Sequence, residues 1–293
     1  MERQKIKFTG AEGNNLIGDL YEPPQQDNSA PPALFLHGGG QTRHSWRGAA
    51  KQLAHLGIAS ITMDARGHGD SDWVQSKDYS IEGYQADTVA LSDHLAQRFG
   101  TRPILIGASL GGLSGMMAVK AAGPSVFSAQ IFVDITPTML PSGVDRIQGF
   151  MAEKMHEGFN SVEEAADAIA IYLPDRPRPK SLDGLRKNLR QREDGRFYWH
   201  WDPAFIDGPH PINKGRETRG AVLQEACRQI TAPTLLIRGS RSELVTEAAA
   251  KEFQELVPHA RFVDVTDAGH MVAGDRNDVF ANAVIDFLKR EVI

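Results

Sequence analysis

The sequence Gly107-Ala108-Ser109-Leu110-Gly111 decides the fold, because it matches the pattern G-x-S-x-G in the context that this pattern needs. An apolar run at 103–107 leads into the serine, and an apolar helical stretch follows it. A strand that enters a helix through one tight turn strains the central residue and lifts its side chain above the sheet. We therefore expect the Ser109 hydroxyl to be presented at the end of a strand. The alternative is a Gly-rich turn that only packs a helix against a strand, since Gly and Ser are common in turns.

On both sides of this motif, short apolar runs alternate with helical stretches, which is typical of βαβ units around a parallel sheet. The expected strands cover residues 4–9, 16–21, 33–37, 58–64, 103–107, 129–134, 233–239 and 261–265, and the main helices cover 43–56, 81–99, 247–256 and 279–290. From about 137 to 220 the strand signal disappears, and helical patterns cover 144–157, 162–172 and 182–193. We expect residues 1–136 and 221–293 to form an α/β core domain and residues 137–220 to form a helical cap over the edge of the sheet.

A serine hydroxyl becomes a nucleophile only beside a base, and the base needs an acid that orients it. His270 is the best candidate base, because it lies in the loop between the last expected strand and the last expected helix. The acid should come from a loop between Ser109 and His270. Glu243, at the tip of the loop after 233–239, is the preferred acid, and Asp134, at the end of the strand before the cap, is the alternative. The chain order of serine, acid and histidine differs from the chymotrypsin and subtilisin orders.

A second glycine motif, His37-Gly38-Gly39-Gly40, follows the apolar run at 33–36 and lets the backbone come close to a substrate. We expect the N–H groups of Gly39 and Leu110 to form an oxyanion hole, because a tetrahedral intermediate needs preorganised donors. A phosphate-binding loop is excluded, since no lysine followed by serine or threonine closes the motif.

The run Asp64-Ala65-Arg66-Gly67-His68-Gly69-Asp70-Ser71 could be mistaken for a metal or acid/base cluster. Its glycines and its position after a strand favour a structural turn, in which Asp64 and Arg66 bond the backbone of the loop. No histidine or cysteine pattern typical of a metal site occurs, so we expect no metal and no other cofactor.

Composition excludes several classes of function. The formal net charge of -5 is spread along 293 residues and gives no footprint for nucleic acid or an anionic membrane. Cys227 is the single cysteine, so no intrachain disulfide can form. The N-terminus lacks the apolar segment of a signal peptide, and no apolar run reaches transmembrane length. We expect a cytoplasmic monomer or homodimer that acts on a small molecule.

Together the motifs resemble the capped α/β-hydrolase superfamily over nearly the whole chain. HGGG at 37–40, DARGHGDS at 64–71, GASLGG at 107–112, RGSRSE at 238–243 and DAGHM at 267–271 follow the order and the approximate spacing of that family. The resemblance implies an eight-stranded, mostly parallel sheet with helices on both faces and a helical cap after the sixth strand. Relatives with an aspartate nucleophile, such as epoxide hydrolases and haloalkane dehalogenases, are disfavoured because position 109 is serine. An acid at Glu243 departs from the commoner Asp, which keeps Asp134 as the alternative.

The resemblance implies a serine hydrolase that cleaves a carboxylic ester or ester-like bond through an acyl-enzyme on Ser109. A lactone hydrolase or a carbon–carbon bond hydrolase with the same triad is an alternative, as is a non-catalytic small-molecule receptor on the same fold. Cleavage of a carbon–carbon bond would need polar groups under the cap, for which Arg178 and His200 are candidates. Aromatic side chains of the cap are expected to line an apolar substrate pocket: Phe150, Tyr172, Tyr198 and Trp199.

Overall fold

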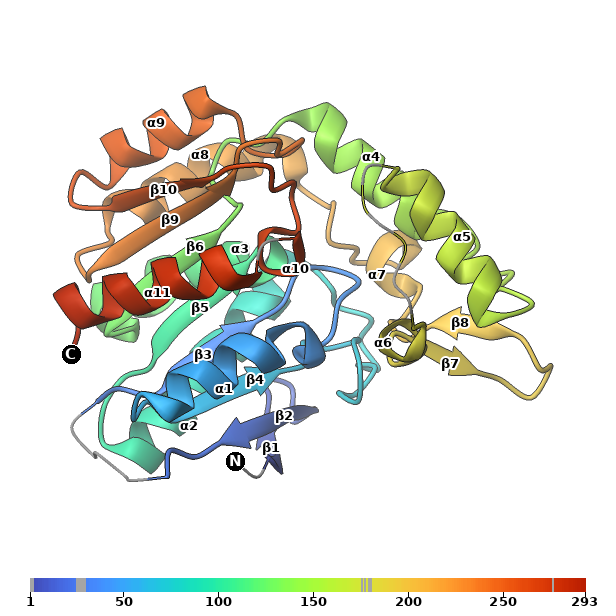
Figure 1. Ribbon diagram of the computed structural model, residues 1–293, viewed down its shortest axis with the longest axis horizontal. Helices are drawn as coiled ribbons and strands as arrows, with labels where there is room; N and C mark the ends of the chain where they lie inside the picture. Colours follow the sequence, from blue (N-terminus) through green and yellow to red (C-terminus); the bar gives the residue numbers. More distant parts are fainter. Residues whose placement is uncertain (1–2, 25–29, 175, 177, 179–180, 276) are drawn as a thin grey trace.

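Eight strands form one sheet through the centre of the protein, in a computed structural model that describes residues 3–24, 30–174, 176, 178, 181–275 and 277–293 (Figure 1). The strands are β1 (Arg3–Thr9), β2 (Asn15–Tyr21), β3 (Ala33–Leu36), β4 (Ser60–Met63), β5 (Ile104–Ala108), β6 (Ala129–Val133), β9 (Thr234–Gly239) and β10 (Arg261–Val265). Their order across the sheet is β1-β2-β4-β3-β5-β6-β9-β10. β2 pairs antiparallel with β1 and β4, and the other pairs are parallel. The expected eight-stranded, mostly parallel sheet is confirmed.

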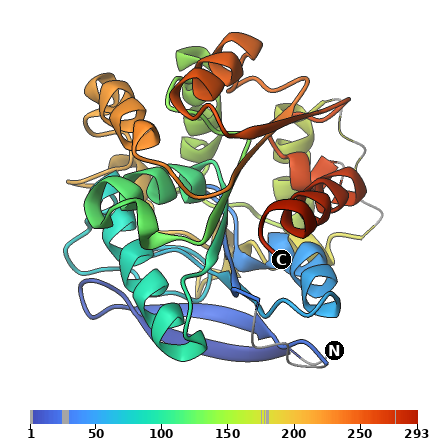
Figure 2. The same ribbon diagram turned by 90° about the vertical axis from the view of Figure 1, so that its left-hand side faces the viewer.

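Helices cover both faces of this sheet (Figure 2). On one face lie α1 (Arg47–His55) and α11 (Asn277–Glu291), and on the other lie α2 (Ile81–Phe99), α3 (Leu110–Ala122), α8 (Arg216–Arg228) and α9 (Glu247–Leu256). Strand side chains alternate between the two layers, as the period of two requires. Leu34 and Leu36 of β3 pack in the cluster that contains α2 and α3, whereas Phe35 packs in the cluster that contains α1 and α11. Burial on both faces explains why the strands read as continuous apolar runs.

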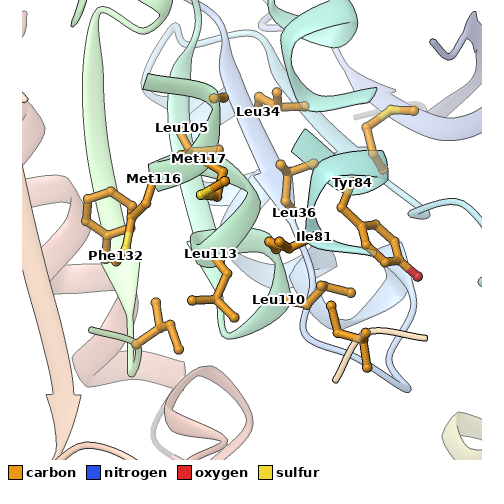
Figure 3. Packing of buried hydrophobic residues seen from close by; sticks show 14 of the residues in the cluster. Leu34, Leu36, Ile81, Tyr84, Leu105, Leu110, Leu113, Met116, Met117 and Phe132 are labelled. Carbon is orange, nitrogen blue, oxygen red and sulfur yellow. The ribbon is translucent and has the colours of Figure 1, made fainter. Parts of the chain in front are cut away.

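The start of α3 packs unusually close to the sheet. A Cβ atom added to Gly111 would lie 2.3 Å from the carbonyl oxygen of Leu36, and one added to Gly115 would lie 2.1 Å from a side-chain carbon of Leu105. Glycine is therefore needed at position 111, where the obstacle is backbone, whereas a larger residue at position 115 would require the Leu105 side chain to move. Side chains of α3 and of the strands beneath it interdigitate in Figure 3, among them Leu113, Met116, Met117, Leu105 and Phe132. This packing fixes the turn before α3 against β3 and β5.

Residues 137–215, called the insertion below, leave the core after β6 and return to it at α8. The insertion contains α4 (Pro141–Ala152), α5 (Val162–Tyr172), α6 (Asp183–Arg186), β7 (Leu189–Gln191), β8 (Phe197–Trp199) and α7 (Ala204–Asp207). It lies to one side of the sheet, at the right of Figure 1. The boundary expected at 220 falls inside α8, and that helix packs against α3 in the core. The described residues also form three short elements: η1 (Arg43–Trp46), η2 (Pro124–Val126) and α10 (Val272–Asp275).

The insertion is not purely helical, which corrects one expectation. The helix expected over 182–193 is limited to α6, and β7 then pairs antiparallel with β8. Gly195, with a φ of 80°, makes the turn, and the N–H of Arg192 donates to the carbonyl of Arg196 at 3.0 Å. Strands of three residues are too short to show an alternating pattern, although the aromatic run at 197–199 favours extended backbone.

No helix within the described ranges is both long enough and apolar enough to span a lipid bilayer.

Candidate active site

Ser109 occupies the tight turn between β5 and α3. Its backbone φ of 46° and ψ of -113° lie where a residue with a side chain is strained. The surrounding fold imposes this conformation: the Ser109 N–H donates to the carbonyl of Val133 at 3.3 Å, and a Cβ atom on Gly107 would lie 2.7 Å from the backbone of Gly111. The serine side chain is half-buried. The sequence therefore creates a strained serine at the end of β5, as the motif predicts.

Asp134 follows β6, the strand next to β5, and is fully buried. Its Oδ1 atom accepts the N–H of Gly239 at 3.0 Å, and its Oδ2 atom accepts the hydroxyl of Ser242 at 2.5 Å. Gly239 is the last residue of β9, and Ser242 lies in the loop that follows it. A buried carboxylate is tolerated only where hydrogen bonds replace its water shell, and here the neighbouring loop supplies them.

His270 lies in the loop after β10, and its Nδ1 atom is 2.7 Å from Oδ2 of Asp134. A carboxylate only accepts hydrogen bonds, so the Nδ1 atom of His270 carries the proton of this bond. The side chain is 16% exposed, so a substrate can reach the ring from the surface. Among the described residues, no hydrogen bond joins His270 to Ser109. The two residues are held by different elements, Ser109 at the end of β5 and His270 after β10.

Glu243 does not orient His270, so the preferred acid of the sequence analysis is wrong and the alternative, Asp134, is the partner of the histidine. The Glu243 carboxylate instead accepts Arg146 of α4 and, at 3.0 Å, the hydroxyl of Tyr172 at the end of α5. The reason is position along the strand. Asp134 directly follows the last residue of β6, whereas Glu243 lies four residues beyond β9, where the loop has already turned toward the insertion.

The loop after β3 lies beside the serine. A Cβ atom on Gly38 would be 3.3 Å from the Cβ atom of Ser109, and one on Gly39 would be 3.1 Å from the ring of Phe205. Leu110 is the first residue of α3, where a backbone N–H has no acceptor within the helix. The two expected donors thus lie on either side of Ser109, Gly39 in the loop after β3 and Leu110 at the start of α3.

A sequence profile of the alpha/beta hydrolase family matches residues 33–283, which include Ser109, Asp134 and His270. The chain belongs to the alpha/beta hydrolase family.

Named relatives of this alpha/beta hydrolase are enzymes. It is similar to the esterase Rv0045c of Mycobacterium tuberculosis, with 28% identity over 253 residues that cover 85% of this chain and 79% of the relative. It is also similar to the 2-(acetamidomethylene)succinate hydrolase of Mesorhizobium japonicum, with 26% identity over 274 residues that cover 93% of each chain. A solved structure of an alpha/beta hydrolase from Novosphingobium aromaticivorans matches with a TM-score of 0.81 and 27% identity, over 99% of both chains. The chain is therefore an alpha/beta-hydrolase enzyme.

The 64–71 run of this hydrolase is a structural turn, as expected. Asp64 accepts the backbone N–H groups of Arg43 and Asp70 at 2.7 and 2.9 Å, and Arg66 donates to the carbonyl of Asp78 at 3.1 Å. Arg66 also makes a two-pronged ion pair with Asp87. Within the described part of the chain, no three His, Cys, Asp or Glu side chains are grouped so that they could hold a metal ion.

Three of the four aromatic residues expected to touch substrate pack on one another, because Phe150 contacts both Tyr172 and, at 5.9 Å between ring centroids, Trp199. Phe150 and Tyr172 stack with their ring centroids 4.3 Å apart, and both are half-buried. Tyr198 and Trp199 are buried in the packing of the insertion itself; the Tyr198 hydroxyl donates to Asp194 at 2.7 Å. All four remain predictions for the substrate pocket, and Trp199 also packs against Phe159 within the insertion.

Two side chains that cover the glycine loop, those of Phe205 and Met151, were not predicted from the sequence, whereas a third, Trp201, is one of the aromatic residues of the insertion, the class expected to line the pocket. The ring of Phe205 faces Gly39, and the side chains of Met151 and Trp201 lie 3.0 and 3.8 Å from where Gly40 would carry a Cβ atom. All three come from the insertion. Only the helical period that places Met151 on the buried face of α4 was available as a signal.

Proposed function

We propose that this alpha/beta hydrolase cleaves a carboxylic ester of a small molecule through an acyl-enzyme on Ser109. One observation carries the proposal: the hydrogen bond between His270 and the buried carboxylate of Asp134, beside a serine held in a strained turn. This is the arrangement in which an imidazole is oriented to accept a serine proton. The similarity to an esterase supports the choice of an ester.

In this mechanism the Nε2 atom of His270 takes the proton of Ser109 while the serine oxygen attacks the carbonyl carbon. The N–H groups of Gly39 and Leu110 hold the oxyanion, and Asp134 stabilises the imidazolium that forms. The imidazolium then protonates the alcohol as it leaves. A water molecule that gives its proton to His270 attacks the acyl-enzyme and releases the acid.

We propose further that the insertion is a cap that encloses the substrate over Ser109. Supporting contacts tie it to the core loops: Tyr79 and Lys77 donate to Asp202 at 2.6 and 2.8 Å, and the N–H of Asp202 donates to the carbonyl of Gly67 at 2.9 Å. The apolar side chains over the glycine loop favour a small acyl group. We also propose a cytoplasmic monomer or homodimer, since the one cysteine, Cys227, is buried and free.

Carbon–carbon bond cleavage is the less favoured reaction, because the two polar candidates for it are engaged elsewhere. Arg178 pairs with Asp167 on the surface, and His200 is buried with both ring nitrogens bonded to backbone. A lactone is a cyclic ester, so its hydrolysis needs no change in the mechanism.

The test is the hydrolysis of p-nitrophenyl acetate and butyrate by the wild type and three variants. Ser109→Ala and Asp134→Ala should each lower kcat by about 10⁴-fold or more, because the triad acts as a unit. Glu243→Ala is the matched control, since it removes a carboxylate from the same sheet edge without touching His270, and it should retain most of the activity.

An equal loss in Glu243→Ala and Asp134→Ala would contradict the assignment of the acid. A wild type without turnover, and without a burst of p-nitrophenol, would remove the esterase proposal. In that case, turnover of a vinylogous diketone would indicate a carbon–carbon bond hydrolase, and tight retention of one small ligand would indicate a receptor.

A further inference from the structure

Three buried histidine rings hold three successive peptide groups of the glycine loop. His37 contacts the carbonyl of Gly38 at 2.7 Å, and the N–H of Gly40 donates to the Nε2 atom of His68 at 3.1 Å. The Nε2 atom of His200 lies 3.2 Å from the carbonyl of Gly40. The peptide groups 38–39, 39–40 and 40–41 are thus each fixed by one ring. All three rings are at most 1% exposed.

The protonation state of each ring follows from its backbone partners. The N–H of Ala65 donates to the Nε2 atom of His37 at 3.0 Å, and the N–H of Gly69 donates to the Nδ1 atom of His200 at 2.7 Å. A backbone N–H can only donate, so each ring has one bare nitrogen that accepts and one N–H that donates to a carbonyl. His68 follows the same rule, between the N–H of Gly40 and the carbonyl of Arg66. All three histidines are therefore neutral.

This arrangement directs the Gly39 N–H. The Gly38 carbonyl and the Gly39 N–H belong to one planar trans peptide and point in opposite directions. With the carbonyl held by His37, the N–H is aimed away from that ring. Glycine residues have a wide range of φ and ψ, so the orientation of the peptide groups between them must be fixed by hydrogen bonds. His68 and His200 fix the next two peptide groups in this way.

His200 differs from the other two rings because it comes from the insertion, one residue after β8. It bridges two core loops, since it accepts the N–H of Gly69 and donates to the carbonyl of Gly40. Arg190 of β7 donates to the carbonyl of Gly69 at 3.1 Å and so secures the same junction. The hairpin β7–β8 thereby reaches the loop that supplies an oxyanion donor.

We propose that His200 is a positioning residue for the hydrolysis. Through its bond to Gly40, the position of the insertion on the core determines the direction of the Gly39 N–H. The inference rests on the proposed function, because it needs the Gly39 N–H to bind the oxyanion. Burial lowers the pKa of His200 to about 3, so the neutral ring persists over the working pH range.

The experiment measures the rate at which a fluorophosphonate inactivates the enzyme. The serine oxygen attacks phosphorus, fluoride leaves, and the phosphoryl oxygen occupies the oxyanion position, so no natural substrate is needed. His200→Leu removes both hydrogen bonds at similar volume, whereas His200→Gln keeps one acceptor and one donor. His156→Leu, at an exposed histidine of the same insertion that pairs with Asp207, is the matched control.

We expect His200→Leu to react at least tenfold more slowly, because a small misplacement of a positioned group costs up to about a hundredfold in rate. His200→Gln should stay within about threefold of the wild type, and His156→Leu should be unchanged. With p-nitrophenyl acetate the loss should fall on kcat and leave KM unaltered. If His200→Leu does not fold, His200→Phe, which keeps a ring and loses both bonds, replaces it with the same expectation.

A folded His200→Leu that reacts at the wild-type rate would overturn the inference and leave the proposed function standing. Equal losses in His200→Leu and His200→Gln would also overturn it, since packing rather than hydrogen bonding would then explain the effect. If the wild type were as unreactive toward the probe as Ser109→Ala, both the proposed function and this inference would be ruled out.

Discussion

At Asp134, three hydrogen bonds from three different residues converge on one buried carboxylate. Ser242 is of particular interest, because its hydroxyl and the Nδ1 atom of His270 bond to the same carboxylate oxygen, Oδ2. The Ser242 oxygen is itself fixed, since it accepts the N–H groups of Leu244 and Val245 at 3.1 and 2.9 Å. The loop after β9 therefore holds the carboxylate in one orientation toward the histidine.

Ser242→Ala should lower kcat for p-nitrophenyl acetate by about tenfold, because a donor aimed at a charged group contributes about 1.5–3 kcal/mol. The free energy of unfolding should fall by a similar amount, and urea denaturation measures it. Ser240→Ala is the control in the same loop, because the Ser240 hydroxyl accepts the N–H of Asp267 at an exposed site and makes no contact with Asp134. Unchanged kcat in Ser242→Ala would show that Gly239 alone orients the carboxylate.

The position of a single residue in the fold could be predicted where one local sequence motif determines that position. Ser109 and His270 each lie in a short pattern next to a strand, and the structure places both at the same edge of the sheet. The acid was not determined in this way, because Asp134 and Glu243 follow adjacent strands and both could reach a histidine in principle. Only the direction of the loop after β9 separates them, and that direction depends on tertiary contacts with α4.

At the scale of elements, Glu243 joins two helices of the insertion to the core. Arg146 of α4 donates to the Glu243 carboxylate and to the backbone carbonyl of Tyr172, and its guanidinium lies 5.2 Å from the centre of the Tyr172 ring. Burial and the Glu243 carboxylate raise the pKa of Tyr172, so the hydroxyl stays protonated and donates. This cluster holds α4 and the end of α5 against the loop after β9.

Glu243→Gln should loosen this junction with little effect on the chemical step. Because the Arg146 side chain is half-exposed, we expect a loss of no more than about 1 kcal/mol in the free energy of unfolding. Amide hydrogen exchange over 141–172 should become faster, and KM should rise two- to fivefold at nearly constant kcat. Glu255→Gln, at an exposed position on α9, should change neither quantity. Slower exchange in Glu243→Gln would contradict the role of Glu243 in holding α4 and α5 against the loop after β9.

Sequence patterns located the strands and helices of the core more accurately than those of the insertion, for a physical reason. Strands covered by helices on both faces must be apolar throughout, so β3, β5 and β6 are visible as short apolar runs. Helix α5 was located at its observed bounds, because its amphipathic period covers three turns. The hairpin β7–β8 has no such signal: its strands are brief, and its stability comes from packing against Phe159 and the core loops.

For the whole molecule, the three buried neutral histidines make stability depend on pH. Burial lowers the pKa of His37, His68 and His200, whereas each would titrate near 6.5 in the unfolded chain. Around His200, Asp64 opposes this shift, and His37 and Arg190 add to it. Below pH 6.5 the unfolded state binds more protons than the folded state, so stability is present above that pH and is lost as the pH falls toward 3.

The expected contribution of His200 is about 1.4 kcal/mol for each pH unit below 6.5, or about 2 kcal/mol at pH 5. His200→Gln does not titrate and should lack this part of the slope. Urea unfolding of both proteins at pH 7.5 and pH 5 measures the difference. Carboxylates add little over this interval, because their unfolded pKa values lie lower. Equal slopes for the two proteins would show that His200 binds a proton in the folded state.

The pairing of β6 with β9 has a consequence for the order in which the chain folds. Gln130 pairs with Thr234, and the insertion occupies most of the sequence between them. Contacts so distant in sequence form late, because a loop of about a hundred residues must close first. A nascent chain that has reached β6 can already build the turn around Ser109, yet Gly239, Ser242 and His270 have not been synthesised. In the proposed mechanism, Ser109 therefore has no base until the last strands have docked, and hydrolysis requires the completed sheet.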